Sequence, residues 1–420
     1  MYKIESIQIN GFWGEFDVGT SLHADVNIFI GKNGTGKTTF MNILHAVLSV
    51  DPIGLNDNQF SEVKIVLADR KKRRTIKAIK AEDPDLAFPL VTYFISNHRF
   101  DLVLSVGDDV RSYSTYRRRT AEQANLIKEQ LSEFVLLSSL SVYRFRQDPD
   151  AETRERTKRA LSPVDSRLGE LRTLLTRYQI ELSMEARNIS AELQKAVLGT
   201  LLYNPEHKVQ GYSLAMNEDR EKQNLIAAYR QLGLSGADIA GRIQKHIAAI
   251  SATLKTLHRP ANGERVQSDV DLAPLEARVR TDRVVELSLY AEKKIDEVYS
   301  QIHSFTKTLQ TFIPEKTFAI EAGNLVAKAK NGTEIDLEKL SSGEKQLLIL
   351  FIEALLQRQI PFVYLADEPE LSLHISWQRK IISAIIALNP NAQIIVATHS
   401  PEIAGRFGTK IIDMEDILHG

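Results

Sequence analysis

A glycine-rich turn followed by lysine and threonine is the clearest chemical pattern in the sequence. Residues 31–38, Gly-Lys-Asn-Gly-Thr-Gly-Lys-Thr, fit the pattern G-x-x-x-x-G-K-[ST] without a mismatch. An apolar run over residues 26–30 precedes the turn as a strand would, and apolar residues recur at helical spacing from residue 40 to residue 47. Glycines let backbone N–H groups turn toward phosphate oxygens, and the start of a helix adds its positive end. The pattern predicts a phosphate-binding loop made of Gly31, Lys32, Asn33, Gly34, Thr35, Gly36, Lys37, Thr38 and Thr39.

Two side chains of this loop have definite chemical uses. Lys37 can reach the β- and γ-phosphates of a nucleotide, and the hydroxyl of Thr38 can take one position on Mg²⁺.

Three further patterns occur near the end of the chain. The sequence Leu-Ser-Ser-Gly-Glu at residues 340–344 is a small-residue turn before an apolar helix, which is a natural place for a second phosphate contact. The apolar strand 362–366 ends in Asp367 and Glu368. The first carboxylate can hold Mg²⁺ through water, and the second can orient or deprotonate an attacking water. His399 follows another apolar strand, 394–398, at the end where open α/β sheets bind ligands.

The elements that must position these residues form three predicted segments. Residues 1–115 and 313–420 have strand patterns around the chemical motifs, including strands at 317–321 and 325–329. A predicted hairpin over residues 63–79 has five consecutive cations at its tip. A solvated turn explains such a run, and a nucleic-acid contact is the alternative. The five cations are Arg70, Lys71, Lys72, Arg73 and Arg74.

The middle segment, residues 116–312, has a helical pattern. Apolar residues recur every seven positions from Leu168 to Ala196, and two further runs around residues 239–257 and 295–312 repeat at three and four. Breakers at 204–206 and 259–263 interrupt the runs. We expect an α/β fold, a mixed sheet with a phosphate-loop core, and within it an inserted α-helical hairpin or small bundle that is too short for a long coiled-coil arm.

Composition excludes several classes of protein. The chain has 420 residues, 43% hydrophobic and 25% charged, which is ordinary for a soluble globular protein of two or three domains. The absence of cysteine excludes disulfides, thiolate metal sites and a cysteine zinc hook. The N-terminus lacks a signal-peptide core, and Glu353 interrupts the apolar run 347–356. We therefore expect a cytoplasmic protein with no membrane contact.

The order of the four motifs resembles the ABC class of ATPases, and within it the branch of SMC proteins, Rad50, RecF and OLD-type ATPases. The resemblance covers roughly residues 1–100 and 315–420. It implies ATP and Mg²⁺ as cofactors and ATP hydrolysis as the reaction. By this resemblance, Lys37 and Thr38 belong to Walker A, and Asp367 and Glu368 belong to Walker B. Ser341, Gly343 and Glu344 belong to the signature motif. His399 is the switch histidine that senses γ-phosphate.

The resemblance has limits and a narrower form. The signature reads Ser-Ser-Gly-Glu, as in SMC-like members, and Gln59 is a candidate Q-loop residue by position only. The modest middle segment and the sequence Asp-Glu-Pro-Glu-Leu-Ser-Leu-His resemble ATPase subunits of bacterial anti-phage systems, namely the PARIS, Septu and retron-associated ATPases. This resemblance implies a head-to-tail dimer or higher oligomer, with the signature of one subunit completing the site of another. It implies a sensor or scaffold that controls a separate effector chain, for which a nuclease is the expected kind.

Several observations bear on the alternatives. The chain ends shortly after His399, so we expect no OLD-type nuclease domain in it, and the acidic segments 83–85 and 148–150 are typical of loops rather than metal ligands. A DNA-binding repair ATPase like RecF or Rad50 is the main alternative. The cations at 70–74 favour it, whereas the net charge of −1 and the missing hook weigh against it. A transporter subunit is disfavoured because Lys37 and Ser341 lie much farther apart than in transporters.

Overall fold

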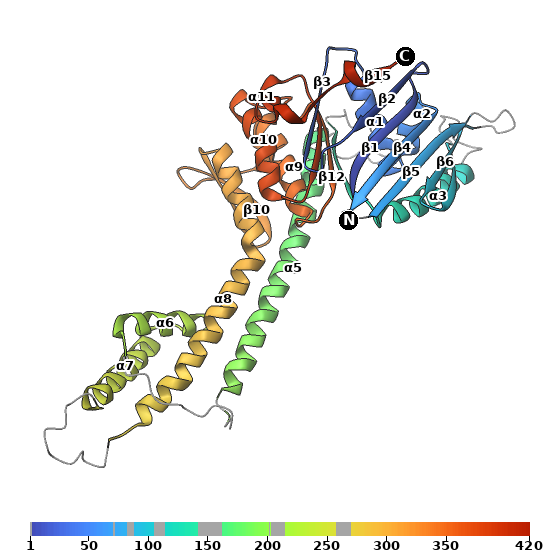
Figure 1. Cartoon of the computed structure of the whole chain (residues 1–420). Helices are drawn as coiled ribbons and strands as arrows, with labels where there is room; N and C mark the ends of the chain where they lie inside the picture. Colours follow the sequence, from blue (N-terminus) through green and yellow to red (C-terminus); the bar gives the residue numbers. More distant parts are fainter. Residues whose placement is uncertain are drawn as a thin grey trace. The chain divides into compact units, whose positions relative to one another are not determined.

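The computed structural model describes residues 2–69, 72–81, 88–104, 114–141, 162–200, 202, 215–257 and 270–420. Within these ranges the chain has an α/β fold and divides into two compact units (Figure 1). The first unit comprises Met1–Thr176 and Ser304–Gly420, and the second comprises Arg177–His303. The chemical motifs all belong to the first unit.

The first unit contains a seven-stranded antiparallel sheet. Its strands alternate buried and exposed side chains, as β4 does, because one face packs on the core. The predicted hairpin is confirmed: β4 and β5 pair from Glu62↔Ile79 to Asp69↔Lys72. Of the five cations predicted for its tip, Lys72, Arg73 and Arg74 instead belong to β5, and residues 70 and 71 lie outside the described residues. In spatial order the strands are β15 (Leu418–His419), β2 (Phe16–Ser21), β1 (Lys3–Phe12), β4 (Glu62–Asp69), β5 (Lys72–Ala81), β6 (Leu90–Ile95) and β7 (His98–Val103).

A second, five-stranded sheet is entirely parallel. Its central strands are continuous apolar runs because both faces are covered. In spatial order the strands are β14 (Ile411–Asp413), β3 (Val26–Ile30), β13 (Gln393–Ala397), β12 (Val363–Asp367) and β8 (Leu137–Ser141).

Strand β8 differs from the sequence prediction, which assigned residues 137–141 to the helical segment. The sequence Leu-Ser-Ser-Leu-Ser has neither the β-branched residues nor the alternation of a typical strand. It is nevertheless paired in parallel with β12 along its whole length. Its strand conformation depends on the pairing with β12, and nothing in the local sequence indicates that partner.

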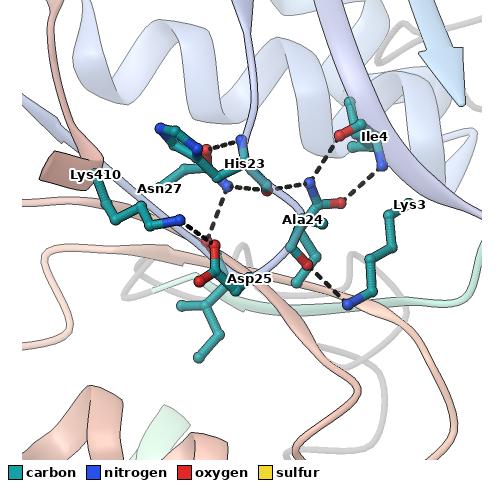
Figure 2. Close-up of polar contacts among 9 residues, drawn as sticks. Lys3, Ile4, His23, Ala24, Asp25, Asn27 and Lys410 are labelled. Atoms are coloured by element: carbon teal, nitrogen blue, oxygen red, sulfur yellow. Dashed lines mark hydrogen bonds and ion pairs between the residues drawn. The ribbon is translucent and has the colours of Figure 1, made fainter. Parts of the chain in front are cut away.

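A buried polar network joins the two sheets. Gln393, at the start of β13, accepts a 2.7 Å hydrogen bond from the Ile4 N–H of β1 and donates to the carbonyls of Ile4 and His23 at 2.7 and 2.8 Å. Asn27 Oδ1 accepts the His23 N–H at 2.7 Å (Figure 2). Both amide side chains are fully buried. Because all of these bonds are made, the network fixes the register of one sheet against the other.

Helices α1 (Lys37–Ser49), α2 (Pro52–Asp57) and α3 (Ser114–Ser132) complete this part of the first unit. The apolar core combines residues of the seven-stranded sheet and α1 with inward side chains of β3, β12 and β13. Phe29 of β3 packs on Phe40 of α1 with ring centroids 4.8 Å apart. This contact fixes the helix that begins at Lys37 against the strand that leads to the phosphate loop.

The rest of the first unit follows residue 312. The predicted strands at 317–321 and 325–329 are confirmed as β9 (Lys316–Glu321) and β10 (Asn324–Ala329), which form a three-stranded sheet with β11 (Glu334–Ile335). The following elements are η1 (Leu337–Lys339), α9 (Ser342–Leu356), α10 (Ile375–Leu388), α11 (Pro401–Ala404), η2 (Gly408–Lys410) and α12 (Met414–Ile417).

The predicted helical insertion is present as α5 (Pro163–Gly199), α6 (Glu218–Gln231), α7 (Ala237–Leu257) and α8 (Ala273–Phe312). Helices α5 and α8 each run from the first unit into the second. Within the second unit the Tyr178 hydroxyl donates to Gln301 Oε1 at 3.2 Å and joins these two helices. Leu225 of α6 packs with Ile243 and Ile247 of α7. No helix among the described residues is long and apolar enough to cross a membrane.

Candidate active site

Three neighbouring parallel strands bring the predicted catalytic residues to one edge of the five-stranded sheet. Strand β13 lies between β3 and β12, and all three run in the same direction. The phosphate loop follows β3, Asp367 ends β12, and His399 follows β13. The carboxyl ends of such strands are where α/β sheets bind ligands.

The phosphate loop requires its glycines for steric reasons. Gly31, Gly34 and Gly36 have φ values of 146°, 85° and 90°, which side chains rarely tolerate. A Cβ at Gly31 would lie 2.8 Å from Thr35 Oγ1, and one at Gly36 would lie 2.8 Å from the Phe12 ring. The loop is thus packed against β1 on one side, and Lys32 and Asn33 are exposed.

Lys37 is directed into the loop that it follows. Its Nζ donates to the carbonyls of Gly31 and Lys32 at 2.8 and 2.9 Å, and only 5% of the residue is exposed. Burial lowers the pKa of Lys37, while the carboxylates of Glu368, Asp367 and Asp413 act in the opposite direction. The ammonium group is therefore placed where it can exchange backbone carbonyls for phosphate oxygens.

The Thr38 hydroxyl lies beside the Asp367 carboxylate. Burial raises the pKa of Asp367 to about 6, and the charges of Glu368 and Glu370 add to the effect, whereas Thr38 and Lys37 lower it. Asp367 Oδ1 is buried and has no hydrogen-bond partner among the described residues. A hydroxyl beside an unsatisfied carboxylate oxygen is the donor set that a hydrated Mg²⁺ requires, so these residues fit that ion.

Glu368 and His399 face each other across the ends of β12 and β13. Glu368 Oε1 lies 3.6 Å from His399 Nε2, and both side chains are about one-third exposed. Glu368 has φ of 48°, and its N–H donates to the carbonyl of Ala397 at 2.8 Å. A carboxylate and an imidazole this close can both contact one water molecule placed beside them.

The predicted signature residues lie at the start of α9. Ser341 is its N-cap and forms a capping box with Glu344. Glu344 accepts hydrogen bonds from Ser341 and is ion-paired with Lys316. Burial alone would raise the pKa of Glu344, but its bonds to Lys316 and Ser341 lower that pKa overall. Among the described residues no hydrogen bond or ion pair joins Ser341, Gly343 or Glu344 to the phosphate loop.

Three residues at the site were missed by sequence reasoning. Trp13 Nε1 donates to Thr39 Oγ1 at 3.3 Å, and the indole covers Gly36. Asp413, at the end of β14, lies beside Gly31. Glu370 bonds to the turn that carries His399. The exposed aromatic in Gly-Phe-Trp-Gly and the third acid after Asp367 and Glu368 were available signals, whereas nothing local distinguished Asp413.

Two other predictions concern Gln59 and the acidic segments. Gln59 is exposed between α2 and β4, with Oε1 4.0 Å from the Cβ position of Gly14. The acidic segments 83–85 and 148–150 lie outside the described residues.

Comparison with known proteins finds matches along most of the chain. The AAA ATPase domain family matches residues 2–404. The chain is 22% identical over 396 residues to the Retron Vc95 probable ATPase of Vibrio cholerae serotype O1 biovar El Tor, covering 91% of this chain and 67% of that protein. It is 28% identical over 131 residues to the Retron Ec83 probable ATPase of Escherichia coli, covering 27% of this chain and 24% of that one.

Among solved structures, the chain is similar to SMC head domains, although the TM-scores are low. The Smc head domain with an extended coiled coil from Pyrococcus furiosus gives a TM-score of 0.46 at 14% identity, covering 98% of this chain and 93% of that one. The SMC head domain from Thermotoga maritima gives 0.39 at 12% identity, covering 96% and 91%. These scores carry no functional weight, whereas the family match spans both halves of the site. The chain therefore belongs to the AAA ATPase domain family, and it is an ATPase.

Proposed function

We propose that this chain binds ATP with Mg²⁺ at the edge of the five-stranded sheet, hydrolyses it there, and uses the cycle to control assembly in an anti-phage defence complex. The observation that carries the proposal is the convergence of five side chains. Lys37, Thr38 and Asp367 meet at one point, and Glu368 faces His399 beside them.

Each residue has a distinct task in the proposed reaction. Lys37 exchanges the carbonyls of Gly31 and Lys32 for the β- and γ-phosphates, and the loop N–H groups surround the phosphates. Thr38 and Asp367 would hold Mg²⁺. When bound there, this ion would neutralise charge on the phosphates. Glu368 orients or deprotonates the attacking water, and His399 contacts the γ-phosphate.

A second copy of the chain is proposed to complete the site. The start of α9 carries small side chains at Ser341 and Gly343, which suit a phosphate at a helix N-terminus, and among the described residues no hydrogen bond or ion pair joins them to their own phosphate loop. Because Glu344 is occupied by Ser341 and Lys316, we propose that it shapes the signature turn rather than contacting nucleotide. A head-to-tail dimer would then enclose two ATP molecules.

The defence role rests on the relatives. Two proteins that match this chain are named retron probable ATPases, which supports a cytoplasmic sensor or scaffold subunit whose ATP state holds or releases a separate effector. ATP can shift such an assembly only by as much as it binds one state better than the other.

The test is the absolute mass in solution of the wild type and Glu368→Gln, each with and without ATP and Mg²⁺. We expect Glu368→Gln to bind ATP, hydrolyse it at least about tenfold more slowly, and remain paired, because general-base catalysis is lost while the phosphate contacts stay. Glu402→Gln is the matched control, since Glu402 is a partly exposed carboxylate that pairs with Arg379.

Two results would change the proposal. If ATP leaves the mass of Glu368→Gln at the monomer value, ATP-driven pairing is wrong. If turnover of Glu368→Gln equals that of the wild type, Glu368 does not have the assigned catalytic role.

A further inference from the structure

A third carboxylate, Glu370, lies just beyond the Asp367-Glu368 pair and makes the bonds that support His399. Glu370 Oε1 accepts the hydroxyl hydrogen of Thr398 at 2.5 Å and the N–H of His399 at 3.1 Å. The two donors belong to the turn after β13, whereas Glu370 belongs to the turn after β12. One carboxylate oxygen thus joins the two turns that carry His399 and Glu368.

The backbone around Glu370 is fixed at several points. The Glu368 N–H donates to Ala397 at 2.8 Å, and the Leu373 N–H donates to the carbonyl of Glu370 at 2.9 Å. Thr398, which is 1% exposed, also accepts the Ser400 N–H at 2.9 Å through its hydroxyl. A shift of Glu370 would therefore displace the turn at residues 398–400 and with it the imidazole of His399.

The arrangement is not what stability alone would favour. Glu370 Oε2 is buried and has no hydrogen-bond partner among the described residues, and its charge adds to that of Asp367 and Glu368 nearby. A buried carboxylate oxygen without a donor is unfavourable, because it has lost its hydrogen bonds to water and gained none in the protein. A side chain with the same acceptor and no charge would hold the two turns without the buried charge, so the acceptor atom Oε1 is the part of Glu370 that joins them.

We propose that Glu370 is a positioning residue that sets His399 against Glu368 by holding the 398–400 turn through its Oε1 atom. The inference rests on the role of His399 in the proposed function. It assigns Glu370 no contact with ATP. Loss of Glu370 should consequently lower kcat and leave nucleotide affinity largely unchanged, because the phosphate loop and Lys37 make no hydrogen bond or ion pair with it among the described residues.

The test compares Glu370→Ala with Glu370→Gln in the full-length protein, with steady-state ATPase kinetics and separate measurement of ATP affinity. Glu370→Ala removes the acceptor, so kcat should fall roughly 10- to 100-fold while KM and the ATP dissociation constant stay within about twofold. Glu370→Gln keeps an acceptor oxygen and should restore kcat to within about threefold of the wild type. Its Tm should be equal to or above that of the wild type, because a buried charge is removed.

A double-mutant cycle separates positioning from a general structural effect. If Glu370 acts through His399, the double variant Glu370→Ala/His399→Ala should be no slower than His399→Ala alone. Glu402→Ala, which removes a carboxylate that bonds to Arg379 in the same part of the fold, should leave kcat unchanged.

Four results would overturn the inference. The first is a wild-type kcat in Glu370→Ala. The second is that Glu370→Ala loses ATP affinity and Tm together with kcat, and that Glu370→Gln does not recover them. The third is that the kcat losses of the two single variants multiply in the double variant. The inference would also be overturned if Glu370→Ala had a low kcat while His399→Ala kept the wild-type kcat. The solution mass tests ATP-driven pairing directly, so failure of the proposed dimer would be recognised separately from these kinetic outcomes.

Discussion

Lys37 has two competing sets of partners, the carbonyls of its own loop and the phosphates of ATP. The carbonyls of Gly31 and Lys32 hold its ammonium group at 2.8 and 2.9 Å in this structure. Phosphate oxygens carry full charge and form stronger hydrogen bonds than neutral carbonyls do. The side chain is therefore already in position before nucleotide arrives.

Replacing Lys37 should consequently weaken nucleotide binding strongly. We expect Lys37→Ala to lose at least about 2 kcal/mol, or roughly 30-fold in affinity, because hydrogen bonds from a charged donor contribute about 1.5–3 kcal/mol each. Lys32→Ala is the matched control: its side chain is 83% exposed and pairs with Glu415, so only its backbone lies in the loop. Equal ATP affinity in Lys37→Ala and the wild type, measured by calorimetry, would contradict the phosphate assignment.

Asp367 makes the nucleotide-free protein sensitive to pH. Its pKa rises from 3.8 to about 6 on folding, so the folded state binds the proton more tightly. The stability that this provides is complete below pH 3.8 and is lost as the pH rises through about 6. Asp367→Asn should therefore stabilise the protein above pH 6 by up to about 3 kcal/mol, and the gain should shrink as the pH falls toward 4. Urea unfolding at pH 8 and pH 5 tests this, and an equal gain at both values would refute it.

At the scale of elements, the start of α9 is fitted closely against the turn after β12. Gly343 is buried in the first turn of α9, and a Cβ there would lie 2.5 Å from the carbonyl oxygen of Ser372. Ser372 itself has φ of 69°. The signature turn and the turn that contains Glu370 therefore cannot move independently without losing this contact.

Alanine substitutions at two helical glycines should have opposite effects. Gly169→Ala in α5 meets nothing within 4 Å and should stabilise by about 0.5–1 kcal/mol, the usual gain inside a helix. Gly343→Ala should destabilise by about 1–3 kcal/mol, because the added methyl overlaps a backbone atom. Thermal unfolding of both variants checks the prediction, which fails if Gly343→Ala melts at or above the wild-type temperature.

The link between the two sheets should depend on one amide. Gln393→Leu keeps the volume but leaves the N–H and carbonyl of Ile4 unsatisfied, at a cost of about 3 kcal/mol or more. Gln8→Leu changes the same residue type at an exposed position of β1 and should cost far less. Similar denaturation midpoints for the two variants would show that the network does not stabilise the fold.

At the scale of the whole molecule, the described cations of the hairpin lie apart from the catalytic edge. Lys72, Arg73 and Arg74 belong to β5, and Arg73 pairs with Glu5 while remaining 72% exposed. Among the described residues, no hydrogen bond or ion pair joins them to the phosphate loop. Their charge is therefore available to a partner without involving nucleotide.

Neutralising these cations distinguishes the proposed function from the DNA-binding alternative. We expect the triple variant Lys72→Ala/Arg73→Ala/Arg74→Ala to keep the ATPase rate and ATP-driven mass change of the wild type. DNA binding by the wild type at several salt concentrations is measured beside it. A salt-sensitive affinity that the triple variant loses, with a slope smaller by up to about 3, would support the DNA-binding alternative instead.

Local sequence determined the parts of this protein whose signals lie within a few residues. The glycines, Lys37 and Thr38 define a strand, a tight turn and a helix start by themselves, because φ preference and helix periodicity are local properties. The apolar runs before Asp367 and His399 likewise predicted buried parallel strands. These motifs were sufficient to predict the ATPase family.

Only the tertiary structure decided which distant residues support that local chemistry. Strand β8 exists because β12 pairs with it, Glu370 matters because β13 ends beside it, and Asp413 reaches Gly31 because β14 pairs with β3. Gln393 is an ordinary polar residue in the sequence and a fully buried link between sheets in the fold. Each of these roles depends on a partner far away in the chain, and neither propensity nor periodicity carries information about such a partner.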